Sequence, residues 1–291
     1  MAIEALVNLW HKDRQDAFFY RKHAMTKAVS TNYSPGTLAD WLRLEGRGIV
    51  TLVGAGGKTT VMYRLARELV ERGKLVLTTT TTRIAWPEPG QTPVVLASGS
   101  GSDLAGPLAR CLERAGHVTA GLSPESAGGK LEGLEPGLID DFLDILPVDW
   151  ILVEGDGAAR KPLKAPAAYE PVVPYRTSLV LGVIGLSCLG LSLEEANVHR
   201  AELFSGLSGL PCGSPLTPDS LVALICHDEG LLKNRPPGAR AAVFLNQAET
   251  DSLVEAGKKI TRSVRQRCRS LIDAAAVGCA RAKAPVFWKI G

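Results

Sequence analysis

Short apolar runs alternate with amphipathic stretches along most of the chain. The apolar runs have the length of buried strands and cover residues 49–53, 74–77, 93–96, 150–153, 178–184, 241–245 and 285–288. The clearest amphipathic stretch places on one helix face the residues Val61, Met62, Leu65, Ala66, Leu69 and Val70. Strands that alternate with helices predict an α/β fold, with a doubly wound, mostly parallel sheet and helices on both faces.

Spacing and capping residues mark several further helices. They are predicted at 37–44 and near 102–115, 137–146, 218–227 and 251–276. Thr217 and Pro218 suit the N-cap and the first position of one of these helices. The last helix is predicted to begin with Thr250 or Asp251 as its cap and to end before Gly278.

The first 30 residues differ from the rest of the chain. They are polar and aromatic, with Trp10, Phe18, Phe19 and Tyr20, and lack the alternation of strands and helices. A chain of 291 residues is long enough for two average domains or one large α/β domain. Because no repeat or low-complexity linker divides the remainder, we expect a flexible N-terminal extension over 1–30 and a single domain over 31–291.

Composition narrows the class of protein. Apolar residues make up 45% of the chain and charged residues 22%, as in globular proteins. The net charge of +3, from 33 basic and 30 acidic residues, is too balanced for a protein whose whole surface is built to bind nucleic acid. The charge is segregated, since residues 102–156 hold eleven acids and three bases, and residues 251–283 hold eight bases and three acids. The basic stretch is either a solvated helix face or a docking surface for an acidic partner.

The sequence predicts neither a membrane segment nor a secretory signal. The longest apolar candidate, 178–190, is shorter than the roughly 18 residues of a membrane span and contains three glycines. The cysteines form no C-x-x-C pair and are Cys111, Cys188, Cys212, Cys226, Cys268 and Cys279. We therefore expect reduced, mostly buried thiols in a cytoplasmic protein rather than a zinc or redox site.

A glycine-rich loop joins the first apolar run to the clearest helix. It reads V-G-A-G-G-K-T-T over 53–60, and its expected phosphate contacts are Gly54, Ala55, Gly56, Gly57, Lys58, Thr59 and Thr60. Glycines let backbone amides converge on an anion, and the positive end of the helix dipole favours negative charge. Lys58 is expected to reach the outer phosphates, and the Thr59 hydroxyl to ligate Mg²⁺.

This loop departs from the strict G-x-x-x-x-G-K-[ST] pattern, because Leu52 stands where that pattern has its first glycine. It reads as a shorter or differently wound variant, similar to the loops of the ATP-dependent Mur and folylpolyglutamate ligases. The order of strand, glycines, Lys-Thr and helix still predicts a P-loop NTPase-like domain that binds ATP or GTP together with Mg²⁺.

A second buried run ends in two carboxylates. Glu154 and Asp156 follow the run 150–153 and point to the same side of an extended chain, since side chains alternate with period two. An acid at the end of an apolar strand organises Mg²⁺ and the attacking water in P-loop enzymes. We therefore expect Lys58, Glu154 and Asp156 to be catalytic, with Thr59, Glu154 and Asp156 at the metal.

Polar residues after two other strands are candidate nucleotide contacts. Thr80, Thr81 and Arg83 follow the second run, at the sheet edge where open α/β sheets bind ligands, although they also suit a strand. Asn246 and Glu249 belong to the motif N-Q-A-E, which lies where GTPases carry the guanine-reading N-K-x-D. Because two of its positions differ, the motif predicts a base pocket without establishing guanine specificity.

Basic residues also lie near the carboxylates. Lys161 and Lys164, with Arg160, belong to a proline-rich loop over 157–174 and are expected to neutralise phosphate or bind an anionic substrate. The alternative is that they are ordinary exposed charges on a loop. His199 is a further candidate, although a single histidine is more often structural.

Seven segments, taken in order, carry a family resemblance. They are V-G-A-G-G-K-T-T (53–60), L-T-T-T-T-T-R-I (77–84), V-D-W-I-L-V-E-G-D-G (148–157), P-L-K-A-P-A-A-Y-E-P-V-V-P (162–174), V-I-G (183–185), N-V-H-R-A-E-L-F (197–204) and L-N-Q-A-E (245–249). Together they resemble the YqeC family, proposed accessory proteins of selenium-dependent hydroxylases. That family usually has L-N-K-x-D at the last segment and commonly E-A-D-G at the acidic one, so this chain departs from it at both.

The resemblance implies a P-loop nucleotide-binding protein that assists the maturation of molybdenum-containing hydroxylases. Its partner would be such a hydroxylase or a cofactor-maturation protein, and NTP hydrolysis would gate delivery or insertion. Two alternatives stay open. One is a nucleotide-dependent ligase or transferase that acts on a selenium species, a pterin cofactor or a carboxylate. The other is a module that holds nucleotide or cofactor without turnover.

Overall fold

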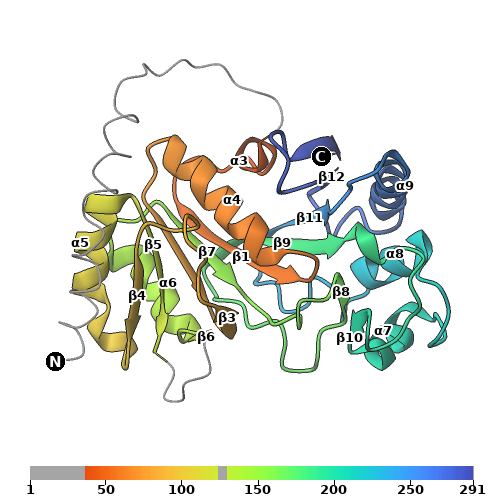
Figure 1. The fold of residues 1–291 in the computed structure, drawn as a ribbon, viewed down its shortest axis with the longest axis horizontal. Coiled ribbons are helices and arrows are strands. Elements are labelled where there is room, and N and C mark those ends of the chain that lie inside the picture. Colours follow the sequence, from red (N-terminus) through yellow and green to blue (C-terminus); the bar gives the residue numbers. More distant parts are fainter. Residues whose placement is uncertain (1–36, 124–129, 291) are drawn as a thin grey trace. The chain divides into compact units, whose positions relative to one another are not determined.

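The computed structural model describes residues 37–123 and 130–290, which belong to one compact unit, Gly36–Gly291 (Figure 1). The predicted flexible extension over 1–30 lies outside the described residues. The architecture is α/β, with a mostly parallel sheet between helices, so the predicted fold class is confirmed. No helix in the described part of the chain is long and apolar enough to cross a membrane.

The main sheet has its parallel strands at the centre and antiparallel strands toward both edges. Its order is β13 (Val286–Ile290), β12 (Ala274–Gly278), β11 (Arg240–Asn246), β9 (Thr177–Gly185), β1 (Gly48–Gly54), β7 (Trp150–Glu154), β2 (Val76–Thr80), β5 (His117–Leu122), β6 (Lys130–Glu132) and β3 (Arg83–Ala85). The strands from β12 to β5 run parallel, while β13, β6 and β3 pair antiparallel. Off this path, β4 (Val95–Ser98) pairs with β5, and β8 (Leu163–Lys164) pairs with β10 (Val198–His199) in a separate small sheet.

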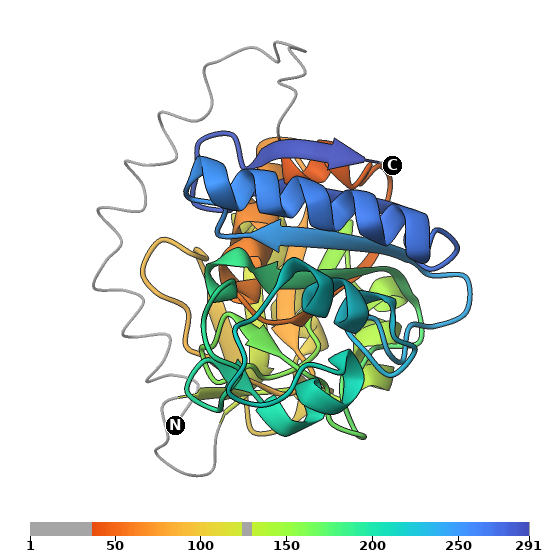
Figure 2. The same cartoon turned by 90° about the vertical axis from the view of Figure 1, so that its right-hand side faces the viewer.

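Helices cover both faces of the main sheet. They are α3 (Leu38–Trp41), α4 (Lys58–Glu71), α5 (Ala105–Ala115), α6 (Pro136–Ile145), α7 (Ala201–Ser208), α8 (Pro218–Cys226) and α9 (Asp251–Arg267), with 3-10 turns at Gly101–Asp103 and Leu186–Cys188. Side chains alternate between the faces, so that Leu152 packs with α3 and α4, whereas Ile151 and Val153 pack with α5 and α6. On that second face, α8 and α9 cover the strands at the other end of the sheet, and Figure 2 shows α9 in blue beside them.

The end of the chain differs from the helix predicted over 251–276. Helix α9 ends at Arg267, and Ala274–Gly278 forms the buried strand β12. A short run of small apolar residues suits either element, and here parallel pairing with β11 decides. Thr250 is the N-cap, because its hydroxyl accepts a hydrogen bond from the Leu253 amide.

The sequence pattern also misses strand β5 and helix α7, as well as the short strands β3, β6, β8 and β10. Strand β5 reads H-V-T-A-G-L, in which small and polar residues interrupt the apolar signal, yet its first five residues are buried. Helix α7 is short and begins after Arg200, which has a left-handed backbone conformation and no capping side chain. Neither segment has the periodicity or the caps on which a sequence prediction depends.

The expectation that all the cysteines are reduced thiols is wrong for one pair. Cys226, at the end of α8, and Cys268, at the end of α9, form a disulfide, although 42 residues separate them in the sequence. Packing of α8 against α9 brings these two ends together, which spacing along the chain does not reveal. Cys188 and Cys279 are buried free thiols, as expected.

A buried polar cluster links β2 and β5 beneath α4. The Thr78 hydroxyl lies 2.7 Å from the Thr119 hydroxyl and 3.1 Å from His117 Nε2, and the Tyr63 hydroxyl lies 3.4 Å from that of Thr119. Burial disfavours the charged imidazole and lowers the pKa of His117 to about 4, from about 6.5. The same effect raises the pKa of Tyr63 to about 12.

We expect the free energy of unfolding to fall as the pH drops from 6.5 to 4. The unfolded chain binds a proton at His117 in this range, whereas the folded chain does not, so stability is complete above pH 6.5. The loss should approach ~3 kcal/mol, measured by urea unfolding at a series of pH values. His117→Gln should remove most of this dependence, whereas His227→Gln, at an exposed histidine, should retain it.

Candidate functional site

The carboxyl ends of the central strands meet along one edge of the sheet. Parallel register places Glu154, the last residue of β7, beside Leu52 of β1 on one side and Thr80 of β2 on the other. On the far side of β9, Asn246 lies beside Gly185. Open α/β sheets bind ligands at this edge. The phosphate loop, the threonines, the carboxylates and the N-Q-A-E motif all follow strands that end here.

The loop between β1 and α4 depends on glycine at its sharpest points. Gly54, Gly56 and Gly57 all have positive φ, at 94°, 79° and 102°. A Cβ on Gly56 would lie 2.0 Å from the backbone nitrogen of Gly185. The loop therefore lies directly against the end of β9, where only glycine fits.

Three amides at the start of this loop donate hydrogen bonds within the protein. The Gly54 amide donates to Asp156 Oδ2 at 3.1 Å, the Ala55 amide to the Val183 carbonyl at 2.9 Å, and the Gly56 amide to the Lys161 carbonyl at 3.1 Å. The first-turn amides of α4 have no acceptor within the helix, and its N-cap, Gly57, supplies no side-chain acceptor. This helix end therefore has the donors and the dipole of an anion site.

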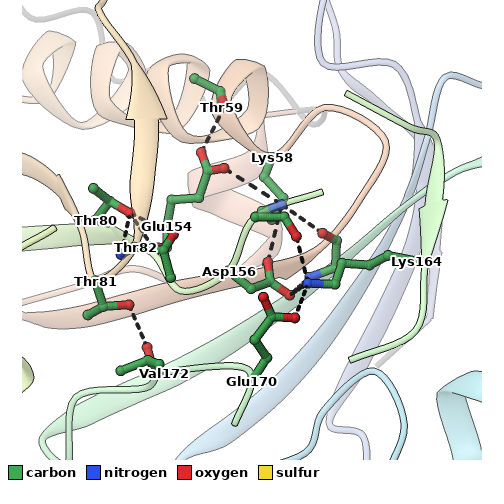
Figure 3. A network of polar contacts seen from close by, with 12 residues as sticks. Lys58, Thr59, Thr80, Thr81, Thr82, Glu154, Asp156, Lys164, Glu170 and Val172 are labelled. Atoms are coloured by element: carbon green, nitrogen blue, oxygen red, sulfur yellow. Dashed lines mark hydrogen bonds and ion pairs between the residues drawn. The ribbon is translucent and has the colours of Figure 1, made fainter. Parts of the chain in front are cut away.

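Lys58 lies between the two predicted carboxylates (Figure 3). Its Nζ is 3.2 Å from Asp156 Oδ1 and 3.6 Å from Glu154 Oε1, and it donates to the Gly54 carbonyl at 2.7 Å. Burial alone would lower the pKa of Lys58, but the carboxylates of Asp156 and Glu154 outweigh that effect and raise it. Burial raises the pKa of Glu154, and the nearby Lys58 ammonium opposes that shift. The structure thus brings together the three residues predicted to be catalytic.

The oxygen atoms of Thr59, Glu154 and Asp156, beside Lys58, are ligands that suit a hard cation such as Mg²⁺. The Thr59 hydroxyl donates to Glu154 Oε2 at 2.7 Å, so Thr59 lies beside a carboxylate as predicted. Asp156 Oδ1 is buried and accepts no hydrogen bond, although it is paired with Lys58. No group of three or more His, Cys, Asp or Glu in the described segments could hold a metal alone. A cation here would share its coordination with ligand oxygens, as Mg²⁺ does with phosphates.

Lys164 continues the line of charges away from Lys58. It is only 2% exposed, and its Nζ lies 3.0 Å from Asp156 Oδ2 and 2.7 Å from Glu170 Oε2, with a 2.6 Å hydrogen bond to the Gly157 carbonyl. Arg200 then pairs with Glu170 at 2.6 Å. Burial would raise the pKa of Glu170, but hydrogen bonds from Arg200 and Lys164 lower it. Sequence reasoning missed Glu170, because nothing in its local sequence distinguishes it from an exposed acid.

Lys161 is held by the β10 region. Its Nζ lies 3.0 Å from Glu195 Oε2 and donates to the Val198 carbonyl at 3.3 Å. Neighbouring His199 lies in β10, and partial burial lowers its pKa. Lys161 and Lys164 therefore lie near the phosphate loop but have protein partners, and their contact with a nucleotide stays a prediction.

The threonines after β2 hold the site's backbone. The Thr80 hydroxyl donates to the Glu154 carbonyl at 2.8 Å, and the Thr81 hydroxyl donates to the Val172 carbonyl at 2.8 Å. Arg83 lies on the edge strand β3, where it pairs with Glu132 at 3.0 Å. Thr80 and Thr81 thus lie at the site, whereas Arg83 is directed to the edge pair β3–β6, and direct nucleotide contacts from all three stay predictions.

Asn246 joins the phosphate loop to the segment after β12. Its Nδ2 donates to the Gly56 carbonyl at 2.7 Å, and its Oδ1 accepts from the Ala280 amide at 2.9 Å. The Gln247 side chain accepts a hydrogen bond from Ser187 at 2.6 Å. Glu249 is exposed. The structure therefore places Asn246 at the loop, and it adds the Ala280 amide, which sequence reasoning missed because no motif marks the segment after Gly278.

Comparison with known proteins agrees with these motifs. The model of the YqeC protein family matches residues 50–202, just over half of the chain. The chain belongs to the YqeC family. A relative in that family, the uncharacterized protein YqeC of Escherichia coli (strain K12), is 35% identical over 203 residues. The alignment covers 68% of this YqeC-family chain and 75% of its relative.

Solved structures with a related chain path include two hydrogenase maturation factors and FtsY. HypB from Archaeoglobus fulgidus has a TM-score of 0.38 at 12% identity, covering 84% of this YqeC-family chain and 88% of that one. HypB from Helicobacter pylori in complex with nickel has 0.35 at 12%, covering 84% and 83%. FtsY from Mycoplasma mycoides has 0.32 at 14%, covering 81% and 62%. Similarity at this level carries no argument about function.

We expect Gly56→Ala to destabilise this YqeC-family protein by about 2–4 kcal/mol. The new Cβ would clash with the backbone of Gly185, and the alanine would have to adopt the positive φ of Gly56. Thermal and urea unfolding measure the change. Gly206→Ala, in helix α7, is the matched control: nothing lies within 4 Å of its Cβ, so its stability should stay equal or rise. Equal stability of the two variants would contradict this account of the loop.

Proposed function

We propose that this protein is a Mg²⁺-dependent nucleoside triphosphatase, a phosphoanhydride hydrolase that acts as an accessory factor in enzyme maturation. The observation that supports the proposal best is the position of Lys58 at the start of α4, within 3.6 Å of carboxylates from the end of the adjacent strand. A phosphate group at this helix end would meet first-turn amides, a buried ammonium and two acids that can order Mg²⁺ and water.

The chain's own groups divide the work of hydrolysis. The amides of Gly57, Lys58 and Thr59 would bind the β- and γ-phosphates, and the Lys58 ammonium would transfer its pairing from the carboxylates to phosphate oxygen. Thr59 and Asp156 would hold Mg²⁺, which neutralises phosphate charge when bound. Glu154, whose pKa is raised by burial, would orient the attacking water.

The nucleotide is proposed to be ATP or GTP, with its base near Asn246. That side chain already fixes the position of the phosphate loop relative to Ala280, at the end of the neighbouring strands. Glu249 is the nearby acid that would contact the base. Thermal shifts and phosphate release, measured with ATP, GTP and molybdopterin nucleotides, would identify the substrate.

The accessory role rests on the family. The resemblance described from the sequence, together with membership of the YqeC family, supports a role in maturing a molybdenum-containing, selenium-dependent hydroxylase. The partner would be the hydroxylase itself or a protein that supplies its cofactor, in the cytoplasm. Phosphate release that requires an acceptor would instead favour a ligase or transferase, and tight binding without release would favour a non-hydrolysing module.

We expect Lys58→Ala to lower kcat for phosphate release by at least about 10²–10³-fold, because it removes a preorganised positive charge from the developing phosphate charge. Thr59→Ala should lower kcat and weaken the dependence on Mg²⁺ while it leaves the buried Lys58–Asp156 pair in place. Lys259→Ala, at an exposed lysine of α9, should match wild type. Circular dichroism would check the folding of each variant. Normal hydrolysis by folded Lys58→Ala would exclude the proposal.

A further inference from the structure

We propose that Arg160 is a catalytic residue that contacts the γ-phosphate and stabilises the charge that develops there during hydrolysis. This inference rests on the proposed NTPase function and assigns a residue to that same site. The phosphate loop and the carboxylates have assigned roles in that site, whereas the basic loop that follows the carboxylates has none.

The backbone next to Arg160 is attached directly to the phosphate loop. The carbonyl of Lys161 accepts the hydrogen bond of the Gly56 amide at 3.1 Å, and the Lys161 amide donates to the Ala158 carbonyl at 2.9 Å. The Lys161 side chain is fixed on its other side by Glu195 and Val198. Arg160 therefore directly precedes Lys161, whose backbone is hydrogen-bonded to the phosphate loop.

The other basic side chains of this loop already have protein partners. Lys161 pairs with Glu195, and Lys164 pairs with Asp156 and Glu170 deep in the structure. Arg160 is exposed, and within the described residues its guanidinium makes no hydrogen bond or ion pair. Of the three loop cations, it is the one available to a ligand.

The backbone conformation at Arg160 is sterically unfavourable for a residue other than glycine. Ala159 and Arg160 are consecutive residues with positive φ, 48° and 61°, in the region that glycine adopts without a steric penalty. Strained backbone of this kind occurs most often at functional sites. Within the described residues, no hydrogen bond or ion pair of the Arg160 side chain offsets this cost, which is consistent with a role in contacting a ligand.

The balance of charges around the site also supports a role for Arg160. Three buried or half-buried cations, Lys58, Lys164 and Arg200, balance three buried carboxylates, Glu154, Asp156 and Glu170. A bound triphosphate carries more negative charge than Mg²⁺ alone neutralises, so a further cation beside Lys58 would stabilise it. The planar fork of an arginine suits phosphate oxygens, and such a group contributes through charge and hydrogen bonding.

The proposed step is ordinary hydrolysis. The water oxygen bonds to the γ-phosphorus as the bond to the β–γ bridging oxygen breaks, and that oxygen leaves with the bonding electrons on the nucleoside diphosphate. The water proton passes to the released phosphate or to solvent. Arg160 donates hydrogen bonds to the phosphate oxygens throughout and exchanges no proton.

Arg160→Gly and Ala159→Gly form a matched pair for the test. Each relieves backbone strain at one residue with positive φ, but only the first removes the guanidinium. We expect Arg160→Gly to lower kcat about 10²–10³-fold with a nucleotide Kd within several-fold of wild type and an equal or higher Tm. Ala159→Gly should keep kcat and also show an equal or higher Tm. Arg160→Lys should recover only part of the loss, because an ammonium lacks the fork.

Each other outcome overturns the assignment. If Arg160→Gly hydrolyses normally while Lys58→Ala does not, Arg160 is not catalytic and the proposed function stands. A lower Tm in Arg160→Gly would show a structural role, and a loss confined to Kd would show ground-state binding alone. Wild-type protein that neither binds nor hydrolyses nucleotide would exclude the proposed function together with this inference.

Discussion

The buried contacts of Lys58 with Asp156 and Glu154 are the interaction on which the site depends. Three charges removed from water would each be costly alone, so they are tolerated only where the loop, α4 and the end of β7 meet closely. Parallel pairing of β1 with β7 fixes that meeting. The Asp156 carboxylate also accepts the Gly54 amide, which ties the first turn of the loop to the same cluster.

From this cluster a line of alternating charges runs to the small sheet of β8 and β10. Asp156 is followed by Lys164, Glu170 and Arg200, and each lies within 3.0 Å of the next. Removing one member would leave its neighbours uncompensated in a place that water reaches poorly. The segment that follows the carboxylates is thereby held against the phosphate loop, and its backbone reaches the loop again at Lys161.

The parts of the site that the sequence predicts well are those defined by residues close together in the chain. The phosphate loop, the carboxylates of β7 and the helix face of α4 follow from spacing, and the structure places Lys58, Thr59, Glu154 and Asp156 together as that spacing predicts. Strand β12 was mistaken for helix, because four small apolar residues fit either period. The sequence also left the three basic residues 160, 161 and 164 equivalent, although their surroundings differ greatly.

By itself, the sequence determined the α/β class, the position of the phosphate loop and the family, because each of these is encoded in residues near one another in the chain. Only the tertiary structure decided that Gly56 lies against Gly185, that Cys226 pairs with Cys268 and that Glu170 neutralises Lys164. These are contacts between distant segments, and no local period or motif records them. Their physical basis is the packing of parallel strands, which brings the ends of separate segments to one edge.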